Sequence, residues 1–308
     1  MTRRYFFACP DVSGASGGVA VIYACVEKLR AAGYDAVILH TSPGYRYAGT
    51  PYSPPIHYSR RIAGVQLARL GRRRMLDRLN PRITETLRPL PDEIGPDDVV
   101  VVPEYLIRDV VQAFPGQPTA VFSQNSFSYL RSFGEARAAG YDPDADVIFN
   151  LVISDTCEEA TRLMSGRPCA RVTVCPNLAL FPFMSKKMPK ICFMPRKRPD
   201  EAKMIHEALE RRGRIGGFDV VAIDGFPQEQ VARIMGESLI FVSLMHHEAL
   251  GFPGIEAMAA GCLVIGYTGL GTREYFDSTT GIPVTEGDTV GVVKAVEDAV
   301  QNYLADPT

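Results

Sequence analysis

Short apolar runs alternate with helical patterns along almost the whole chain, and this alternation limits the fold more than any other feature. In the first half the runs occur at 5–9, 36–40, 98–104, 119–124 and 147–154. They lack the strict alternation of a half-exposed strand, so we expect strands buried on both faces of a parallel sheet. The second half repeats the rhythm at 191–195, 218–224, 239–244 and 262–267. The sequence therefore predicts an α/β chain with two doubly wound domains.

The length of the chain supports two domains. A chain of 308 residues that is 46% hydrophobic exceeds one average core. The segment "LALFPFMSKKMPK" (178–190) combines prolines and lysines without a period, which is typical of a linker. We expect a domain over 1–180 and a second over 188–308, two Rossmann-like units facing across a cleft. Ligands of open parallel sheets bind at the carboxyl ends of the strands, so the site is expected there.

Composition argues against several classes of protein. A net charge of -2 gives the whole chain no preference for nucleic acid. The seven cysteines are scattered and form no paired CxxC spacing, so neither a disulfide framework nor a zinc site is indicated. We find no apolar run long enough to cross a bilayer and no signal peptide at the start. We expect a soluble cytoplasmic protein.

One basic stretch departs from this balance. Eight arginines and a single acid, Asp77, lie between Arg60 and Arg82. The apolar positions among them allow an amphipathic helix on anionic lipid. Two interpretations stay open: a solvated helix face, or a surface at 60–82 for an acceptor or for peripheral contact with the inner face of a membrane.

The turn "SGASGG" connects the first apolar run to a helical pattern. Gly14, Gly17 and Gly18 allow backbone N–H groups to approach an anion at a helix N-terminus. The spacing is not GxGxxG, and the next strand ends in His40 and Thr41 rather than in an acid, which argues against a nicotinamide dinucleotide. A tight turn without a ligand is the alternative.

A basic cluster follows the first strand of the second domain. Arg196, Lys197 and Arg198 come directly after this strand, with Lys203 further on in the helix. Guanidinium and ammonium groups at a strand's carboxyl end suit a diphosphate, because they neutralise its charge and stabilise it as a leaving group. A solvated basic cluster is the alternative.

The stretch "HHEALGFPGIEAMAAG" (246–261) contains two carboxylates on either side of a glycine-rich bend. We place Glu248 before the bend and Glu256 in the first turn of an apolar helix. A carboxylate there is favourable by itself, by roughly 0.3 to 1 kcal/mol, so Glu256 alone is explained as a capping acid. Two acids flanking Gly251 and Gly254 suggest more: amides close to a sugar or phosphate, with one acid for a ribose and the other for a transferred sugar.

These residues resemble a known family. "EALGFPGIEAMAAGCLVIG" is similar to the signature of retaining GT-B glycosyltransferases of the family-four type, in which two glutamates are separated by seven residues. "YTGLGTREYF" resembles the next loop of that family, "SGGVAVIYACVEKLRAAGYDAVIL" its first βαβ unit, and "CFMPRKR" its diphosphate-binding segment. The likeness covers most of the chain and is weak between 42 and 118.

The resemblance implies roles for individual residues. Glu256 would bind the nucleotide ribose, and Glu248 would lie near the donor sugar and the reaction centre. The backbone amides of the bend would contact sugar or phosphate; this bend comprises Gly251, Phe252, Pro253 and Gly254. Arg196 with Lys197 or Arg198 would hold the diphosphate, and Gly17 and Gly18 would close over the donor.

The sequence departs from the family at one position, and it offers no metal site. Many relatives have a histidine after the strand at 119–124, where this chain has Gln124 and Asn125, amides that bind a sugar but relay no proton. The acidic segment "DPDAD" (142–146) is interpreted as a solvated loop, and His246 and His247 lack a third ligand. We expect no metal and no cofactor.

Together these observations predict a metal-independent glycosyltransferase that moves a sugar from a nucleotide-diphosphate sugar to a hydroxyl of a growing glycan or glycolipid. The resemblance implies retention of the anomeric configuration and a role in polysaccharide biosynthesis. Two alternatives stay open: a nucleotide-sugar epimerase of the same architecture, and a non-catalytic protein that binds nucleotide or carbohydrate.

Overall fold

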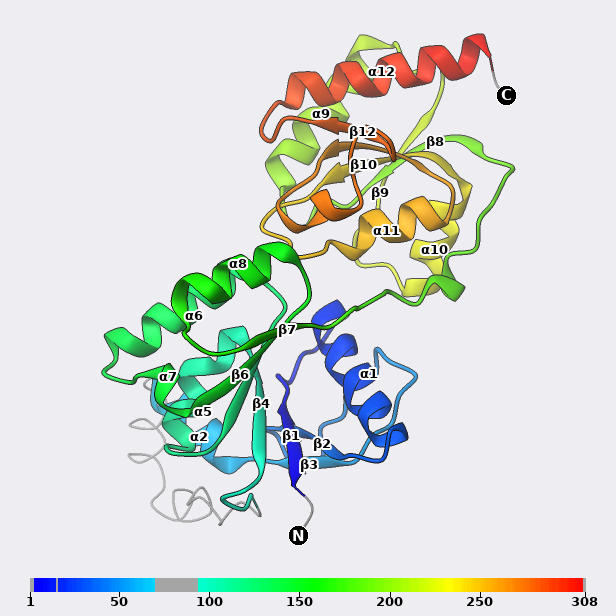
Figure 1. Cartoon of the computed structure of the whole chain (residues 1–308). Helices are drawn as coiled ribbons and strands as arrows, with labels where there is room; N and C mark the ends of the chain where they lie inside the picture. Colours follow the sequence, from blue (N-terminus) through cyan, green and yellow to red (C-terminus); the bar gives the residue numbers. More distant parts are fainter. Residues whose placement is uncertain (1–2, 15, 70–93, 307–308) are drawn as a thin grey trace, which may run out of the picture. The chain divides into compact units, whose positions relative to one another are not determined.

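The computed structural model describes residues 3–14, 16–69 and 94–306 and divides into two compact α/β units (Figure 1). The first unit comprises Met1–Ile153 and Cys157–Val174, and the second comprises Ser154–Thr156 and Cys175–Thr308. Among the described residues, each unit contains one sheet, of seven strands in the first unit and of five in the second.

The first unit is a Rossmann-like sheet in which every described strand pair is parallel. Its strand order, β3-β2-β1-β4-β5-β6-β7, is that of dinucleotide-binding domains with one strand added. Its elements are β1 (Arg4–Ala8), α1 (Gly17–Ala31), β2 (Asp35–His40), β3 (Ile56–Tyr58), α2 (Arg60–Arg69), β4 (Val99–Pro103), η1 (Glu104–Leu106), α5 (Ile107–Ala113), β5 (Thr119–Ser123), α6 (Ser126–Ala138), α7 (Pro143–Asp146), β6 (Val147–Val152), α8 (Asp155–Met164) and β7 (Cys169–Arg171).

Uninterrupted apolar sequence explains why the central strands are buried on both faces. All five residues of β4, the run "VVVVP", are buried, as are all five residues of β5. Ile62 of α2, Ile107 of α5 and Phe133 of α6 pack into one core against these strands. Helix α1 covers the opposite face (Figure 1). Because the chain leaves β1 toward one face and β4 toward the other, a crevice is expected between the ends of these two strands.

The second unit is also a parallel sheet, with the order β12-β11-β10-β8-β9. Counted from β8, this is the flavodoxin-like order, in which the direction of winding reverses between the first and third strands. Its elements are η2 (Leu178–Leu180), β8 (Met188–Phe193), α9 (Pro199–Arg212), β9 (Asp219–Ala222), α10 (Gln228–Glu237), β10 (Ser238–Leu244), α11 (Phe252–Ala259), β11 (Leu263–Tyr267), η3 (Gly271–Glu274), β12 (Ile282–Val284) and α12 (Thr289–Ala305).

Two separate cores cover the faces of the second sheet. Ile205 of α9 and Val296 of α12 belong to one core, and Met235 of α10 and Ala257 of α11 belong to the other. Figure 1 shows the two helix pairs on opposite sides of the sheet. Helices α9 and α11, which follow β8 and β10, therefore lie on opposite faces, and the ends of these two strands are the switch point of the unit.

The segment expected to be a linker packs on the second unit. Phe181 is 2% exposed within its core. The Lys187 ammonium donates to the carbonyl oxygens of Gly236, at 2.8 Å, and Ala260, at 2.6 Å. The unit boundary accordingly falls at Cys175, before the segment, whereas the sequence analysis placed the first domain's end at 180.

Two predictions concern a membrane: the absence of a helix that crosses it, and the basic stretch 60–82 that could contact its surface. No helix among the described residues is long and apolar enough to cross a membrane. Of the basic stretch at 60–82, residues 60–69 form α2, and residues 70–82 lie outside the described residues. Within α2, Arg69 pairs with the buried carboxylate of Asp109 at 3.0 Å, so part of its charge is used inside the unit.

Candidate functional site

The switch point of the second unit brings the two predicted motifs together. The basic segment lies between β8 and α9, and the glutamate loop lies between β10 and α11. Strands β8 and β10 are hydrogen-bonded neighbours, with Phe193 opposite Val242. The carboxyl ends of adjacent parallel strands meet at one edge of the sheet, so segments separated by about fifty residues share a site.

Lys197 and Glu248 form an ion pair across this switch point. Both side chains keep access to solvent, with 39% of Lys197 and 22% of Glu248 exposed. A carboxylate accepts hydrogen bonds from hydroxyl groups, which suits Glu248 to a sugar. The sequence analysis singled out both residues, and the structure places them in contact.

Arg198 differs from the two basic residues before it, because acids and acceptors of the protein surround it. Its guanidinium pairs with Glu201 at 2.6 Å and also with Glu286. It donates to the carbonyl oxygen of Met245 at 3.3 Å and lies over the ring of Tyr267 at 5.1 Å. The side chain is 10% exposed. Arg198 thus joins the start of α9 to the loop after β10.

Arg196 is the contrasting case. Its side chain is exposed, and within the described part of the chain no acid pairs with it. Arg196 is therefore a cation whose charge no acid of the described residues neutralises, whereas Lys197 is a cation already paired with Glu248. A diphosphate bound at the switch point would lie beside both. Lys203 is exposed on α9.

The helix that carries Glu256 begins earlier than the sequence analysis placed it, and that expectation was wrong by one turn. Gly251 caps α11 in the left-handed conformation (φ 65°), and Pro253 occupies its first turn, so the helix starts at Phe252. Glu256 therefore lies in the second turn. This position removes the capping explanation, because a capping acid belongs in the first turn.

Glu256 is a partly buried carboxyl without a partner. In the described part of the structure no donor bonds to its carboxylate, and burial raises its pKa to about 7. An unpartnered carboxylate has both oxygens available for hydroxyl donors from a ligand. Its environment is thus the opposite of that of Glu248, which has a cation beside it.

The glycines of the bend have a structural role that the sequence analysis missed. The Tyr275 hydroxyl donates to the Gly251 carbonyl at 2.6 Å. A Cβ on Gly254 would lie 2.7 Å from that hydroxyl, and a Cβ on Gly251 would overlap the Thr272 methyl group. Burial, together with the charges of Glu248 and Glu256, raises the pKa of Tyr275, which places this ring beside both acids.

The bend offers fewer backbone donors than predicted. The Gly254 N–H donates to the Gly251 carbonyl at 3.1 Å, and Pro253 has no N–H group. Among the four residues of the bend, this leaves the N–H groups of Gly251 and Phe252 for a ligand. Next to the bend, His247 has a positive φ of 49°, a strained conformation for a residue other than glycine.

In the first unit, two of the predicted positions touch and one is a helix cap. Gly17 and Gly18 open α1, and the Gln124 side-chain amide donates to the Gly18 carbonyl at 3.3 Å. The Asn125 side chain accepts from the Ser128 N–H at 3.0 Å as the N-cap of α6, which gives it a structural role.

A buried acid behind Gln124 escaped the sequence analysis. Glu104 is 2% exposed and accepts from the Gln124 N–H at 2.8 Å. Burial raises its pKa to about 7. In the sequence Glu104 only ends an apolar run, so no local signal distinguishes it.

The acids of the "DPDAD" segment serve the fold. Asp142 caps α7, Asp144 accepts from Ser165 at 2.7 Å, and Asp146 accepts from the Gly116 N–H at 3.1 Å. Nowhere in the described ranges do three or more His, Cys, Asp or Glu side chains gather in an arrangement that holds a metal. His246 and His247 stack on each other with ring centroids 3.8 Å apart.

Comparisons with known proteins agree with this geometry. Residues 196–302, which span both motifs, match the family model "Glycosyl transferases group 1". The chain is 32% identical to an alpha-1,6-glucosyltransferase of Actinobacillus pleuropneumoniae serotype 7, over 36% of this chain and 39% of that protein. The match thus spans well under half the length of this curated relative.

Solved structures share the fold of both units. Sucrose-phosphate synthase from Thermosynechococcus elongatus superposes with a TM-score of 0.62 at 16% identity, covering 99% of this chain and 90% of that one. TarM of S. aureus, in a complex that contains UDP, gives a TM-score of 0.65 at 9% identity, covering 98% and 94%.

The fold and the paired motifs define a class: a chain of two Rossmann-like units with the GT-B fold. Within this class, residues 196–302 of the second unit match the model of the glycosyl transferases of group 1. The resemblance predicted from the two glutamates and the glycine bend is thereby confirmed.

Proposed function

We propose that the chain transfers a sugar from a nucleotide-diphosphate sugar to a hydroxyl acceptor, with the donor bound at the switch point of the second unit. The observation that supports this proposal is the ion pair of Lys197 with Glu248 across the ends of β8 and β10, with Tyr275 beside both Glu248 and the unpartnered acid Glu256. Cations suit the diphosphate, and carboxylates suit the hydroxyl groups of the sugar and of the ribose.

Arg196 and Lys197, with the N–H groups of Gly251 and Phe252 at the start of α11, would hold the diphosphate. Glu256 would accept the ribose hydroxyls, and Glu248 would fix the transferred sugar. Cations of the protein, rather than a metal, would neutralise the leaving group. UDP-glucose is the first donor to test, because the curated relative is a glucosyltransferase and TarM was solved with UDP.

The same groups suit transfer with retention of configuration. The bond between the anomeric carbon and the diphosphate oxygen breaks, and the bond to the acceptor oxygen forms on the same face. The acceptor proton passes to the departing diphosphate, so no dedicated nucleophile is required. The acceptor would be a hydroxyl of a glycan or glycolipid, and a glycolipid would bring the basic stretch 60–82 to an anionic membrane surface.

Steady-state turnover of nucleotide sugars tests the proposal. Glu248→Gln removes the charge beside the sugar and Glu256→Ala removes the ribose acceptor, so each should lower kcat/KM about a hundredfold or more. Glu207→Gln, on the exposed face of α9, is the matched control and should keep full activity. Circular dichroism of each variant checks that folding survives.

Product analysis separates the alternatives. Conversion of the donor sugar without an acceptor would identify an epimerase. Nucleotide binding without turnover toward any acceptor would identify a binding protein. Unimpaired transfer by either glutamate variant would refute the assignment of the site.

A further inference from the structure

Arg198 lies at the switch point of the second unit, but most of its N–H groups are already bonded within the protein. A guanidinium has five N–H groups. Those of Arg198 meet four acceptors: the carboxylates of Glu201 and Glu286, the carbonyl oxygen of Met245 and Nδ1 of His246. The two carboxylates more than offset the single positive charge, so this group by itself offers a diphosphate no net attraction.

Two of these contacts hold the loop after β10, which carries Glu248. Nε of Arg198 donates to the Met245 carbonyl at 3.3 Å, and Nη2 donates to Nδ1 of His246 at 2.8 Å. Because an arginine only donates, Nδ1 of His246 accepts, and the ring carries its proton on Nε2. The His246 ring stacks on the His247 ring with centroids 3.8 Å apart. Arg198 thus holds two residues of the loop directly and contacts a third through this stack.

His247 is the residue of this loop that requires such support. Among the described residues other than glycine it alone has a positive φ, of 49°. Such a conformation persists only where the surrounding contacts hold it. Arg198 holds the residues before His247, and after it the Gly271 N–H donates to the Glu248 carbonyl at 3.1 Å. The backbone is therefore fixed on both sides of the strained residue.

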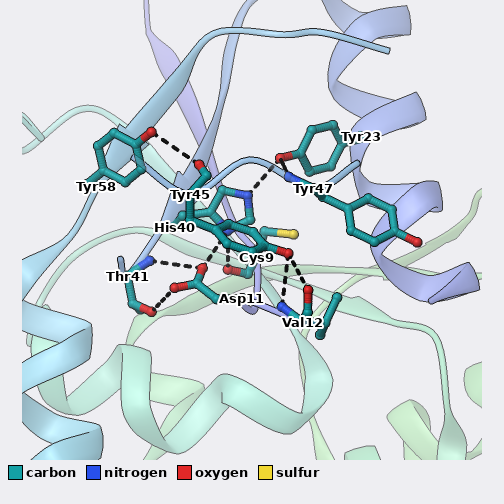
Figure 2. A network of polar contacts seen from close by, with 9 residues as sticks. All are labelled: Cys9, Asp11, Val12, Tyr23, His40, Thr41, Tyr45, Tyr47 and Tyr58. Carbon is teal, nitrogen blue, oxygen red and sulfur yellow. Dashed lines mark hydrogen bonds and ion pairs between the residues drawn. The ribbon is translucent and has the colours of Figure 1, made fainter. Parts of the chain in front are cut away.

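A histidine of the first unit shows the contrasting arrangement, in which a polar network serves the fold (Figure 2). His40 is fully buried, with its Nε2 2.8 Å from the Tyr23 hydroxyl and its Nδ1 2.8 Å from Asp11 Oδ1. None of the residues drawn there has a positive φ. The second unit instead places its strained residue, His247, directly before Glu248. Strain at such a position indicates a function rather than a requirement of the core.

Lys197 and Arg198 are adjacent in the sequence but hold different parts of one loop, since Lys197 pairs with the Glu248 carboxylate itself. We propose that Arg198 is a positioning residue, which keeps His247 in its strained conformation and so orients the Glu248 carboxylate, and that it is not a ligand of the diphosphate. The diphosphate is left to Arg196 and Lys197. This role rests on the proposed function, in which Glu248 fixes the transferred sugar.

Arg198→Lys separates positioning from binding. Lysine keeps the charge but lacks the planar fork, so it cannot bond the Met245 carbonyl, His246 and both acids together. The affinity for UDP, measured by calorimetry, should stay within about threefold of wild type, whereas kcat for turnover of UDP-glucose should fall about tenfold to a hundredfold through misplacement of the sugar. Arg196→Met should instead weaken UDP about tenfold or more, because a charged contact is lost.

Two controls accompany these variants. Arg211→Lys makes the same exchange at an exposed position in the last turn of α9, and it should leave both the UDP affinity and kcat unchanged. Retained binding of UDP by Arg198→Lys shows in addition that this variant folds.

Nitrogen-15 NMR of the histidine rings tests the contact without any nucleotide. The chain has five histidines, so the His246 signals are assigned by their loss in His246→Gln. At pH 8, where imidazole is neutral, wild-type His246 should show a proton on Nε2 and an accepting Nδ1. In Arg198→Lys the two tautomers should mix, and the ring signals should shift, whereas Arg211→Lys should leave them in place.

The outcomes distinguish this role from the proposed function. If the wild type binds none of UDP, ADP and GDP, the proposed function fails, and the role fails with it. If a nucleotide binds, a loss of its affinity in Arg198→Lys as large as in Arg196→Met would make Arg198 a diphosphate ligand and overturn the role alone. Unchanged His246 signals in Arg198→Lys, or full turnover by this variant, would also overturn it.

Discussion

Glu248 and Glu256 are the same residue type in two different environments. Lys197 neutralises Glu248, whereas Glu256 is partly buried with a pKa of about 7 instead of its ordinary 4.5. The folded protein therefore holds a proton at Glu256 that the unfolded chain releases. Because the unfolded state binds fewer protons between pH 4.5 and about 7, this group's contribution to stability falls as pH rises through that window.

Binding of a nucleotide sugar should lower the pKa of Glu256, so that the carboxyl group loses its proton. A ribose that donates hydroxyl hydrogen bonds favours the ionised carboxylate, so the affinity for a nucleotide sugar should rise about tenfold between pH 6 and pH 8. Calorimetric titration over this range checks the expectation, with a nucleotide sugar as ligand because its diphosphate does not titrate there. Glu256→Gln should show a flat profile, and an equally steep rise in that variant would assign the effect to another group.

The sequence alone predicts those site residues that belong to a local sequence motif. Glu248, Glu256 and the bend between them form one short motif, and Lys197 follows a recognisable strand. Tyr275 and Glu104 were missed, because their importance depends on contacts formed only after the strands assemble. The pairing of Asp11 with His40 likewise depends on the parallel register of β1 with β2, in which Ala8 lies opposite Leu39.

At the scale of elements, the buried strands were predictable, as was the edge strand β9 (Asp219–Ala222), whereas the other three edge strands were not. The runs that form β4, β5 and β10 are apolar throughout, and each strand lies within a residue or two of its predicted place. Strands β3, β7 and β12 have three residues each and carry no apolar run. Such short strands form because a neighbouring strand offers a free edge, so their own sequence contains little signal.

The packing of Tyr275 against the glycine bend predicts a measurable coupling between the two loops. Gly254→Ala would push against the Tyr275 hydroxyl and should lower the free energy of unfolding by about 1 to 3 kcal/mol, the usual cost of overpacking. In a Tyr275→Phe background the hydroxyl is gone, and the same substitution should cost less than about 1 kcal/mol. Urea unfolding of the four proteins gives the coupling energy; equal costs in both backgrounds would show that this contact does not require the glycine.

At the scale of the whole molecule, two alternating α/β halves predicted two units, and each unit has its own core. The boundary between the two units depends on tertiary packing, which the pattern of apolar residues along the sequence does not predict. Phe181 and Lys187 belong to a segment without regular pattern, yet one is buried in the second unit and the other binds its carbonyl groups. The residues that match the family model, 196–302, all lie in the second unit.

The central claim is that the second unit binds the nucleotide diphosphate at the ends of β8 and β10. Amide hydrogen exchange, measured by mass spectrometry with and without saturating UDP or another nucleoside diphosphate that raises the melting temperature, tests it most directly. The account predicts slower exchange in 195–198 and 245–256. Protection confined to other parts of the chain, with these two segments unchanged, would contradict it.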